Sequence, residues 1–186
     1  SIDICPFQLA NELHAGLQEL CAHEGFRFAE NGVQLHARQA SAFHVQFDGN
    51  SLEVEYREPV QFFRALSYLK ASALSSFLLC RQPTFQSNGV MLDCSRNAVP
   101  TVDTVKTILR KMSLMGLNTL MLYTEDTYEI PELPYFGYLR GRCSASQLRE
   151  LDDYASRFPV SRHWPIWNAL CTGPKSTPRC GTPETF

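Results

Sequence analysis

Apolar residues early in the chain follow the spacing of a helix packed against a sheet. Between Phe7 and Glu24 they recur every three or four residues, which predicts one buried helical face, and Gly25 stands where a helix C-terminus is expected. The apolar residues of this face are Ala10, Leu13, Leu17, Leu20 and Cys21.

Short alternating stretches follow this helix. Residues 43–47 and 52–56 alternate apolar with polar side chains on either side of Asp48-Gly49-Asn50, which predicts a hairpin with one wet face. Residues 26–28 and 33–36 show the same alternation. Pro59 suits a helix start, and the apolar stripe after it is Phe62, Phe63, Leu66, Leu69 and Ala73. We therefore expect residues 1–84 to form a small α+β domain, a sheet with packed helices.

The pattern changes in residues 85–158. Gly89–Leu92 is almost entirely apolar, as expected of a strand buried on both faces, and residues 117–123 read as a second buried strand. Thr101 can cap a helix between them that Gly116 closes, and Ser144 with Gln147 forms a capping box for a further helix. Strand, helix, strand and helix at this spacing predict a parallel βαβα arrangement and an α/β fold.

The last segment, residues 159–186, has no periodicity of either kind. It holds five of the eleven prolines and both tryptophans, Trp164 and Trp167. The composition predicts an irregular tail.

Composition and charge exclude several classes of protein. The 186 residues are 44% hydrophobic and carry 17 basic against 19 acidic side chains, so no electrostatic footprint for nucleic acid or an anionic membrane is present. No apolar run reaches the ~20 residues of a membrane helix, and the start lacks a signal-peptide pattern. Seven cysteines without a CxxC indicate a reducing compartment, and we expect a cytoplasmic protein.

Polar residues gather after each of the two predicted parallel strands. Asp93–Asn97 follow the first strand and Thr124–Glu129 follow the second. Ligands of parallel α/β folds meet the residues beyond the carboxyl ends of strands, so these two segments should form one rim suited to hydroxyl-rich ligands. The alternative is that Arg96 only pairs with Asp93 or Asp126 and holds the loops together.

Other candidate sites are weaker. His14 and His23 are nine residues apart and do not share a helix face, while His36 and His44 lie in strand-like stretches and are interpreted as structural. Glu53 and Glu55 are interpreted as the solvated face of the hairpin. Nucleotide-binding and serine-hydrolase motifs are absent, and Cys171 and Cys180 lack zinc-site spacing, so we expect neither a metal nor an organic cofactor.

Several sequence blocks stand in a fixed order across residues 88–158. They are GVMLDCSRNAVP, LNTLMLYTEDTYEIPELPYFGYLRGR and LRELDDYA. These blocks resemble the start of the catalytic barrel of family 20 glycoside hydrolases (GH20), the β-N-acetylhexosaminidases, and above all the bacterial branch whose barrel opens with LD-x-SRNAVP. The preceding domain resembles, more loosely, the α+β domain that stands before the barrel in this family.

The resemblance implies a TIM (β/α)8 barrel that removes terminal N-acetylglucosamine or N-acetylgalactosamine from glycans with retention of configuration. In the family the substrate's 2-acetamido oxygen attacks the anomeric carbon, so the enzyme supplies no nucleophile. Arg96 matches the family arginine that binds ring hydroxyls, and its planar fork suits two adjacent hydroxyls. Asp126 matches the acidic residue that ends the second strand and acts through a histidine of the third. Tyr128 and Glu129 are expected to line the same rim.

One departure from the family matters more than the match. The family's catalytic pair is an Asp-Glu dipeptide after the fourth strand, and this sequence contains none. Glu125-Asp126 has the reverse order on the wrong strand. We therefore expect no catalytic residue in this chain, a truncated barrel without hydrolytic activity, and self-association through open sheet edges. The alternative is a non-catalytic truncated module that binds carbohydrate or a partner protein.

The tail has a further interpretation. Where the family continues with a third strand beginning Gly-Ile-Glu, this chain reads PVSRHWPIWNALCTGPKSTPRCGTP. Back-translated and read in a shifted frame, the stretch can spell a family-like strand with an Ala-His-Leu. We interpret residues 159–186 as a frameshift product.

Overall fold

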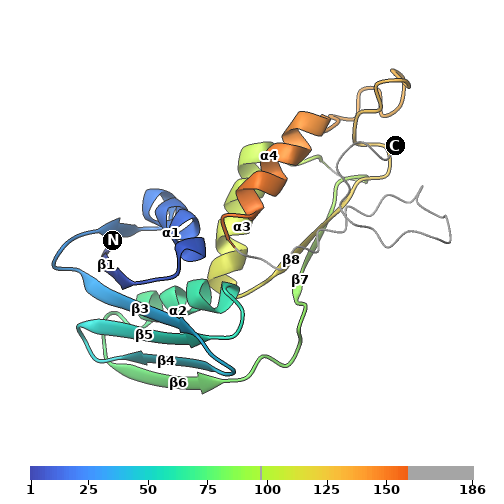
Figure 1. Cartoon of the computed structure of the whole chain (residues 1–186). Coiled ribbons are helices and arrows are strands. Elements are labelled where there is room, and N and C mark those ends of the chain that lie inside the picture. The colour runs from blue at the N-terminus through green and yellow to red at the C-terminus, as the bar shows by residue number, and fades with distance from the viewer. Residues whose placement is uncertain (97, 159–186) are drawn as a thin grey trace.

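The computed structural model describes residues 1–96 and 98–158. A six-stranded sheet and a separate pair of parallel strands are linked by helices that pack together between them (Figure 1). The chain is therefore a mixed α/β protein, as the sequence predicts. The frameshift hypothesis and the prediction of an irregular tail concern residues 159–186, which lie outside the described residues.

The first part of the chain forms the larger sheet and two helices. Its strands run in the order β2-β1-β3-β5-β4-β6, and β4 is antiparallel to both β5 and β6 while the other pairs are parallel. The elements are β1 (Ile2–Gln8), α1 (Asn11–His23), β2 (Phe26–Phe28), β3 (Val33–Gln39), β4 (Phe43–Phe47), β5 (Ser51–Tyr56), α2 (Val60–Ala71) and β6 (Phe77–Arg81).

The hairpin predicted around Asp48 is present between β4 and β5. Val45 pairs with Val54 and both are buried. Glu53, the residue before Val54 in β5, points to the opposite face and is exposed, so the hairpin has one apolar and one wet face. The Asp48 carboxylate accepts hydrogen bonds from the backbone amides of Asn50 (2.8 Å) and Ser51 (2.7 Å). The turn is thus fixed by its own aspartate.

The start of the chain differs from the expectation. The helix begins at Asn11, and Phe7 belongs to β1, where its side chain is 68% exposed. The alternation in Ile2–Gln8 is too weak to indicate a strand. The pairing of β1 with β2 and β3 on either side supplies what local pattern does not.

The second part consists of β7 (Gly89–Asp93), α3 (Val102–Met115), β8 (Thr119–Tyr123) and α4 (Ala145–Ala155). The predicted helix signals are confirmed. The Thr101 hydroxyl accepts from the Thr104 amide (3.2 Å), Gly116 ends α3 at φ +74°, and Ser144 and Gln147 form a reciprocal capping box. β7 and β8 pair in parallel, with Met91 opposite Met121.

The prediction that β7 is buried on both faces is wrong for the described residues. Leu120 and Leu122 of the neighbouring β8 are buried on one face of the pair, whereas Met91 on the other face is 61% exposed. The apolar face that carries Met91 has no layer packed over it within residues 1–96 and 98–158 that would remove this side chain from water. Such a face is what a larger sheet or barrel would cover.

The two parts share one hydrophobic core. The ring of Phe63 on α2 meets that of Phe158, just after α4, edge-on at a centroid distance of 5.4 Å. The Arg64 guanidinium donates to the Leu114 carbonyl of α3 (3.2 Å). Among residues 1–96 and 98–158, every helix is too short or too polar to cross a bilayer.

Candidate functional site

The carboxyl ends of β7 and β8 bring the two predicted polar segments together. Asp93 and Tyr123 are opposite each other in the parallel register, and the Cys94 amide donates to the Tyr123 carbonyl (2.9 Å). The residues after each strand therefore start from the same edge. We call residues 93–96 and 123–129 the rim.

Arg96 lies on the rim with its guanidinium in solvent. Its Nε is 3.4 Å from Asp93 Oδ2, and its guanidinium carbon is 6.0 Å from the centre of the Tyr123 ring. The sequence leaves Asp93 and Asp126 as ion-pair partners of Arg96, and in the structure Arg96 pairs with Asp93. Since 74% of the Arg96 side chain is exposed, this pair is weak and leaves the arginine accessible to a ligand.

Asp93 fixes the backbone that carries Arg96. Its Oδ1 accepts from the Ser95 hydroxyl (2.7 Å), the Ser95 amide (3.0 Å) and the Arg96 amide (3.2 Å). These bonds, that of the Ser95 hydroxyl first, lower the pKa of Asp93 below its ordinary value. Asp93 is accordingly ionised at neutral pH and serves as an acceptor only.

Tyr123 and Glu125 form a second pair on the rim. The Tyr123 hydroxyl donates to Glu125 Oε1 (2.8 Å), and this bond to a carboxylate raises the pKa of the tyrosine. Glu125 has φ +46°, a left-handed conformation that is uncommon for a residue other than glycine. The turn after β8 is therefore held in an unusual conformation at a predicted binding edge.

Asp126 is half-buried and faces an arginine from far along the chain. Arg140 Nη2 is 3.5 Å from Asp126 Oδ1, and the same nitrogen donates to the Ser95 carbonyl. Asp126 Oδ1 is removed from solvent without a hydrogen bond in the described residues, as is the hydroxyl oxygen of Thr124. Within the described residues both oxygens could take part in a further hydrogen bond, Asp126 Oδ1 as an acceptor and the Thr124 hydroxyl as a donor or an acceptor.

Arg140 is the rim contact that sequence reasoning missed. It lies in the long loop between β8 and α4, where no periodicity indicates which side chain points back toward the strands. The glycines on either side of it, Gly137 (φ +62°) and Gly141 (φ +65°), are the only local signal, because they mark a tightly turned segment.

Tyr128 and Glu129 lie in the first part of that loop. The Tyr128 ring packs edge-on against Phe136 at 5.2 Å, and the Glu129 amide donates to the Cys143 carbonyl (3.0 Å). The Glu129 side chain is exposed. Tyr128 thus contributes to folding the loop back on itself, and the expectation that both residues line a sugar site stays a prediction.

Two histidines have contacts within the fold. The His36 ring lies 5.1 Å from that of Phe7, and His14 Nδ1 is 3.1 Å from the Ala10 carbonyl. The structural interpretation of His44 stays a prediction. In the part of the chain that the structure describes, no group of three His, Cys, Asp or Glu side chains is placed to hold a metal ion.

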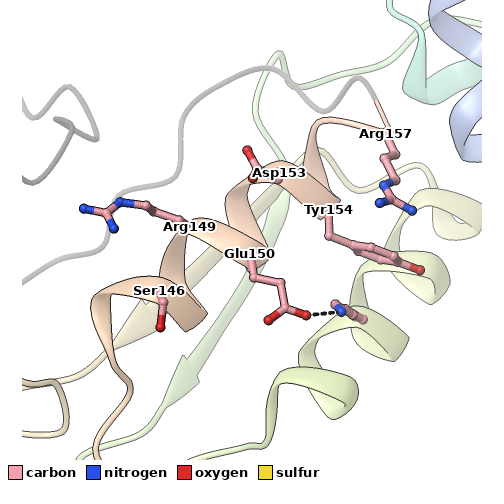
Figure 2. Close-up of a pocket in the computed structure, with 7 residues that line it drawn as sticks. Ser146, Arg149, Glu150, Asp153, Tyr154 and Arg157 are labelled. Carbon is pink, nitrogen blue, oxygen red and sulfur yellow. Dashed lines mark hydrogen bonds and ion pairs between the residues drawn. The ribbon is translucent and has the colours of Figure 1, made fainter.

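Two surface hollows lie away from the rim, among the helices. The larger, about 380 Å³, is lined by α4 and by Arg157 just after it (Figure 2), and Lys106 of α3 also lines it. The smaller, about 330 Å³, lies where α1, α3 and α4 meet. Several of their charges are paired within the protein: Lys106 with Glu150, and Arg157 with Glu19. No rim residue lines either hollow, so neither is the predicted sugar site.

The fold is similar to that of several solved GH20 structures. The GH20 exo β-N-acetylglucosaminidase of Vibrio harveyi, solved with N-acetylglucosamine, matches 86% of this chain with a TM-score of 0.66 at 18% identity. The chain has the fold of part of a GH20 enzyme. The GH20 β-N-acetylhexosaminidase of Streptomyces coelicolor A3(2) matches 85% with a TM-score of 0.64 at 17% identity. A mutant Streptomyces plicatus β-hexosaminidase, in complex with its product N-acetylglucosamine, matches 85% with a TM-score of 0.65 at 16% identity.

The chain spans only part of these GH20 structures. The match covers 32% of the Vibrio harveyi protein and 40% of each Streptomyces protein. No protein-family model matches the sequence, and no curated protein matches it. The GH20-like fold is thus established by structure, and activity is a separate question.

Proposed function

We propose that this chain is part of an exo-acting β-N-acetylhexosaminidase that releases terminal N-acetylglucosamine or N-acetylgalactosamine from glycans. Residues 1–84 form the domain before the barrel, and residues 85–158 contribute the first βαβα units of a TIM (β/α)8 barrel. The observation that carries the proposal is the rim, where Arg96 and Asp126 stand at the carboxyl ends of β7 and β8 in a GH20-like fold.

The uncovered apolar face supports the same assignment. In a closed barrel, one face of every strand points to the interior and the other to the surrounding helices. Met91 is on the face opposite to that of the buried Leu120 and Leu122, so it would fill the barrel interior once further strands closed around it.

The chemistry follows from the residue types. The Arg96 guanidinium would donate two parallel hydrogen bonds to adjacent sugar hydroxyls. Asp126, whose Oδ1 is buried and has no hydrogen bond to any described residue, would accept from a donor that a third strand brings. Cleavage would follow the substrate-assisted retaining route, with the acetamido oxygen as nucleophile. Because the sequence has no Asp-Glu dipeptide, the pair that orients the acetamido group and protonates the leaving oxygen is not in this chain.

The absence of an Asp-Glu dipeptide also supports a second function. By itself the chain would act as a non-catalytic carbohydrate-binding or interaction module, and the exposed Met91 face would favour self-association. The enzyme and the carbohydrate-binding module both place a sugar at Arg96, but only the enzyme requires further barrel strands.

Sugar binding by the chain itself tests the rim assignment. We expect N-acetylglucosamine, titrated into the ¹⁵N-labelled protein, to shift the Ser95 and Arg96 amide resonances with a Kd of roughly millimolar order. Arg96→Ala should abolish these shifts, and Arg149→Ala, an exposed arginine of α4, should leave them unchanged. Shifts that persist in Arg96→Ala would remove the assignment.

A further inference from the structure

We propose that Arg140 is a positioning residue of the sugar-binding rim, which clamps the loop after β7 to the loop after β8 and so sets the place of Arg96. The inference rests on the proposed function, because it concerns the same rim. Arg140 acts through Ser95 and Asp126 and has no assigned contact with the sugar.

Arg140 bridges the two loops through one nitrogen. Its Nη2 donates to the Ser95 carbonyl, whose peptide leads directly into Arg96, and lies 3.5 Å from Asp126 Oδ1. The register of β7 and β8 ends at Asp93 and Tyr123, so the strand ladder does not reach these two loops. In the described residues the Arg140 side chain supplies a direct link between them.

Both acceptors that Arg140 contacts are buried. Ser95 is buried, and its amide and hydroxyl are occupied by Asp93, which leaves its carbonyl as the free acceptor that Arg140 fills. Asp126 Oδ1 is buried and has no hydrogen bond, so the positive charge at 3.5 Å is its principal compensation in the described residues. One guanidinium thus donates a hydrogen bond to the Ser95 carbonyl and lies at ion-pair distance from the Asp126 carboxylate.

The loop that carries Arg140 is held against the rim independently. A methyl group on Gly137 would lie 1.8 Å from the Asp126 carbonyl oxygen, so the loop backbone touches the turn after β8 at this point. Arg142 Nη1 donates to the Phe136 carbonyl (2.8 Å) and closes the loop on itself. Arg140 is therefore presented from a preformed segment, which lowers the entropy lost in making the clamp.

Lysine is a partial replacement for this role. An ammonium also offers one charged nitrogen with several donors, but it stands on a flexible stem, whereas Nη2 is held in the plane of a rigid guanidinium. We therefore expect Arg140→Lys to keep part of the clamp and Arg140→Ala to lose it.

The test compares Arg140→Ala, Arg140→Lys and the control Arg149→Ala by ¹⁵N spectra, with N-acetylglucosamine as the titrant and thermal unfolding in parallel. In Arg140→Ala we expect the Ser95 and Arg96 amides to shift before sugar is added and sugar affinity to fall roughly ten-fold, about the worth of one charge-assisted hydrogen bond. Arg140→Lys should lie between Arg140→Ala and the wild type. Arg149→Ala should match the wild type.

The outcomes separate this proposal from the function it rests on. If the wild type binds the sugar and Arg140→Ala binds it equally well, the positioning role is overturned. If the wild type does not bind, the proposed rim function fails, and the sugar-free spectra still decide: unmoved Ser95 and Arg96 amides overturn the clamp, and shifted ones uphold it. Should Arg140→Ala not fold, the same comparison is made with Arg140→Lys.

Discussion

Gly137 allows the loop between β8 and α4, which carries Arg140, to approach the rim closely. At φ +62° it has a left-handed conformation, and a Cβ there would lie 1.8 Å from the Asp126 carbonyl oxygen. Gly141, four residues later, has nearly the same φ of +65°, but its nearest neighbour would be Val99 Cβ at 3.9 Å. The two glycines have the same backbone requirement but differ in the space available for a side chain.

This difference gives a matched pair of variants. Gly137→Ala should displace the loop and shift the Asp126 and Arg140 amide resonances, because conformational strain and overlap with backbone act together. Gly141→Ala has only the strain of a positive φ, about 1 kcal/mol, and should leave the Asp126 resonance in place. Equal spectra for the two variants would show that the loop does not rest on Asp126.

At this scale the sequence predicts some residues of the rim and not others. Arg96 and Asp126 could be placed because each comes a few residues after a recognisable strand, and parallel strands end at one edge. Arg140 could not, because a side chain in a long loop is placed by contacts such as that of Gly137 with Asp126, which no local pattern encodes.

Helices α3 and α4 owe their boundaries to side chains that were identifiable in advance. For α4, the Ser144 hydroxyl accepts from the Gln147 amide (3.2 Å), while the Gln147 side chain accepts from the Ser144 amide (2.9 Å). Such a box satisfies two backbone donors that a helix start would otherwise leave without partners.

Removing the hydroxyl tests the cap. We expect Ser144→Ala to lower the free energy of unfolding by about 1 kcal/mol and Ser144→Asp, which keeps an acceptor, to lower it by less. Chemical denaturation followed by circular dichroism measures both. A Ser144→Ala protein as stable as the wild type would mean that tertiary packing, not the cap, defines the start of α4.

Elements whose limits depend on distant partners are the ones that local pattern misses. Strand β1 exists because β2 and β3 pair with it. The exposure of Met91 in β7 is decided by which elements pack over that face of the strand, not by the apolar sequence of β7 itself. Capped helices and the Asp48 hairpin, by contrast, carry their signals within a few residues.

Across the whole molecule, Glu24 joins the two parts of the chain. Its side chain, 3% exposed at the end of α1, is 3.5 Å from Arg110 Nε and pairs with Lys111, both on α3. Its backbone carbonyl accepts from Lys70 of α2 (2.7 Å). The buried carboxylate thus makes the docking of α1 on α3 depend on charge pairing as well as on the shared core, and the backbone carbonyl adds a link to α2.

Removing this carboxylate should leave the nearly buried Arg110 short of a partner. We expect Glu24→Ala to lower the free energy of unfolding by about 2–3 kcal/mol, at or below the low end of the roughly 3–5 kcal/mol of a broken buried pair, because Lys111 is 58% exposed. Glu55→Ala, which breaks the exposed pair with Arg38, should cost less than about 1 kcal/mol. Urea unfolding compares them, and equal losses would contradict the docking role of Glu24.

The measurement that bears most directly on the central claim is the sequence of the encoding DNA from the codon of Asp153 to well beyond that of Phe186. If the chain is part of a GH20 β-N-acetylhexosaminidase, a reading frame should continue into further strand–helix units and encode an Asp-Glu after the fourth strand. The joined protein should then hydrolyse a chromogenic N-acetylglucosaminide. DNA that encodes no such continuation in any frame would contradict the enzymatic account and favour the binding module.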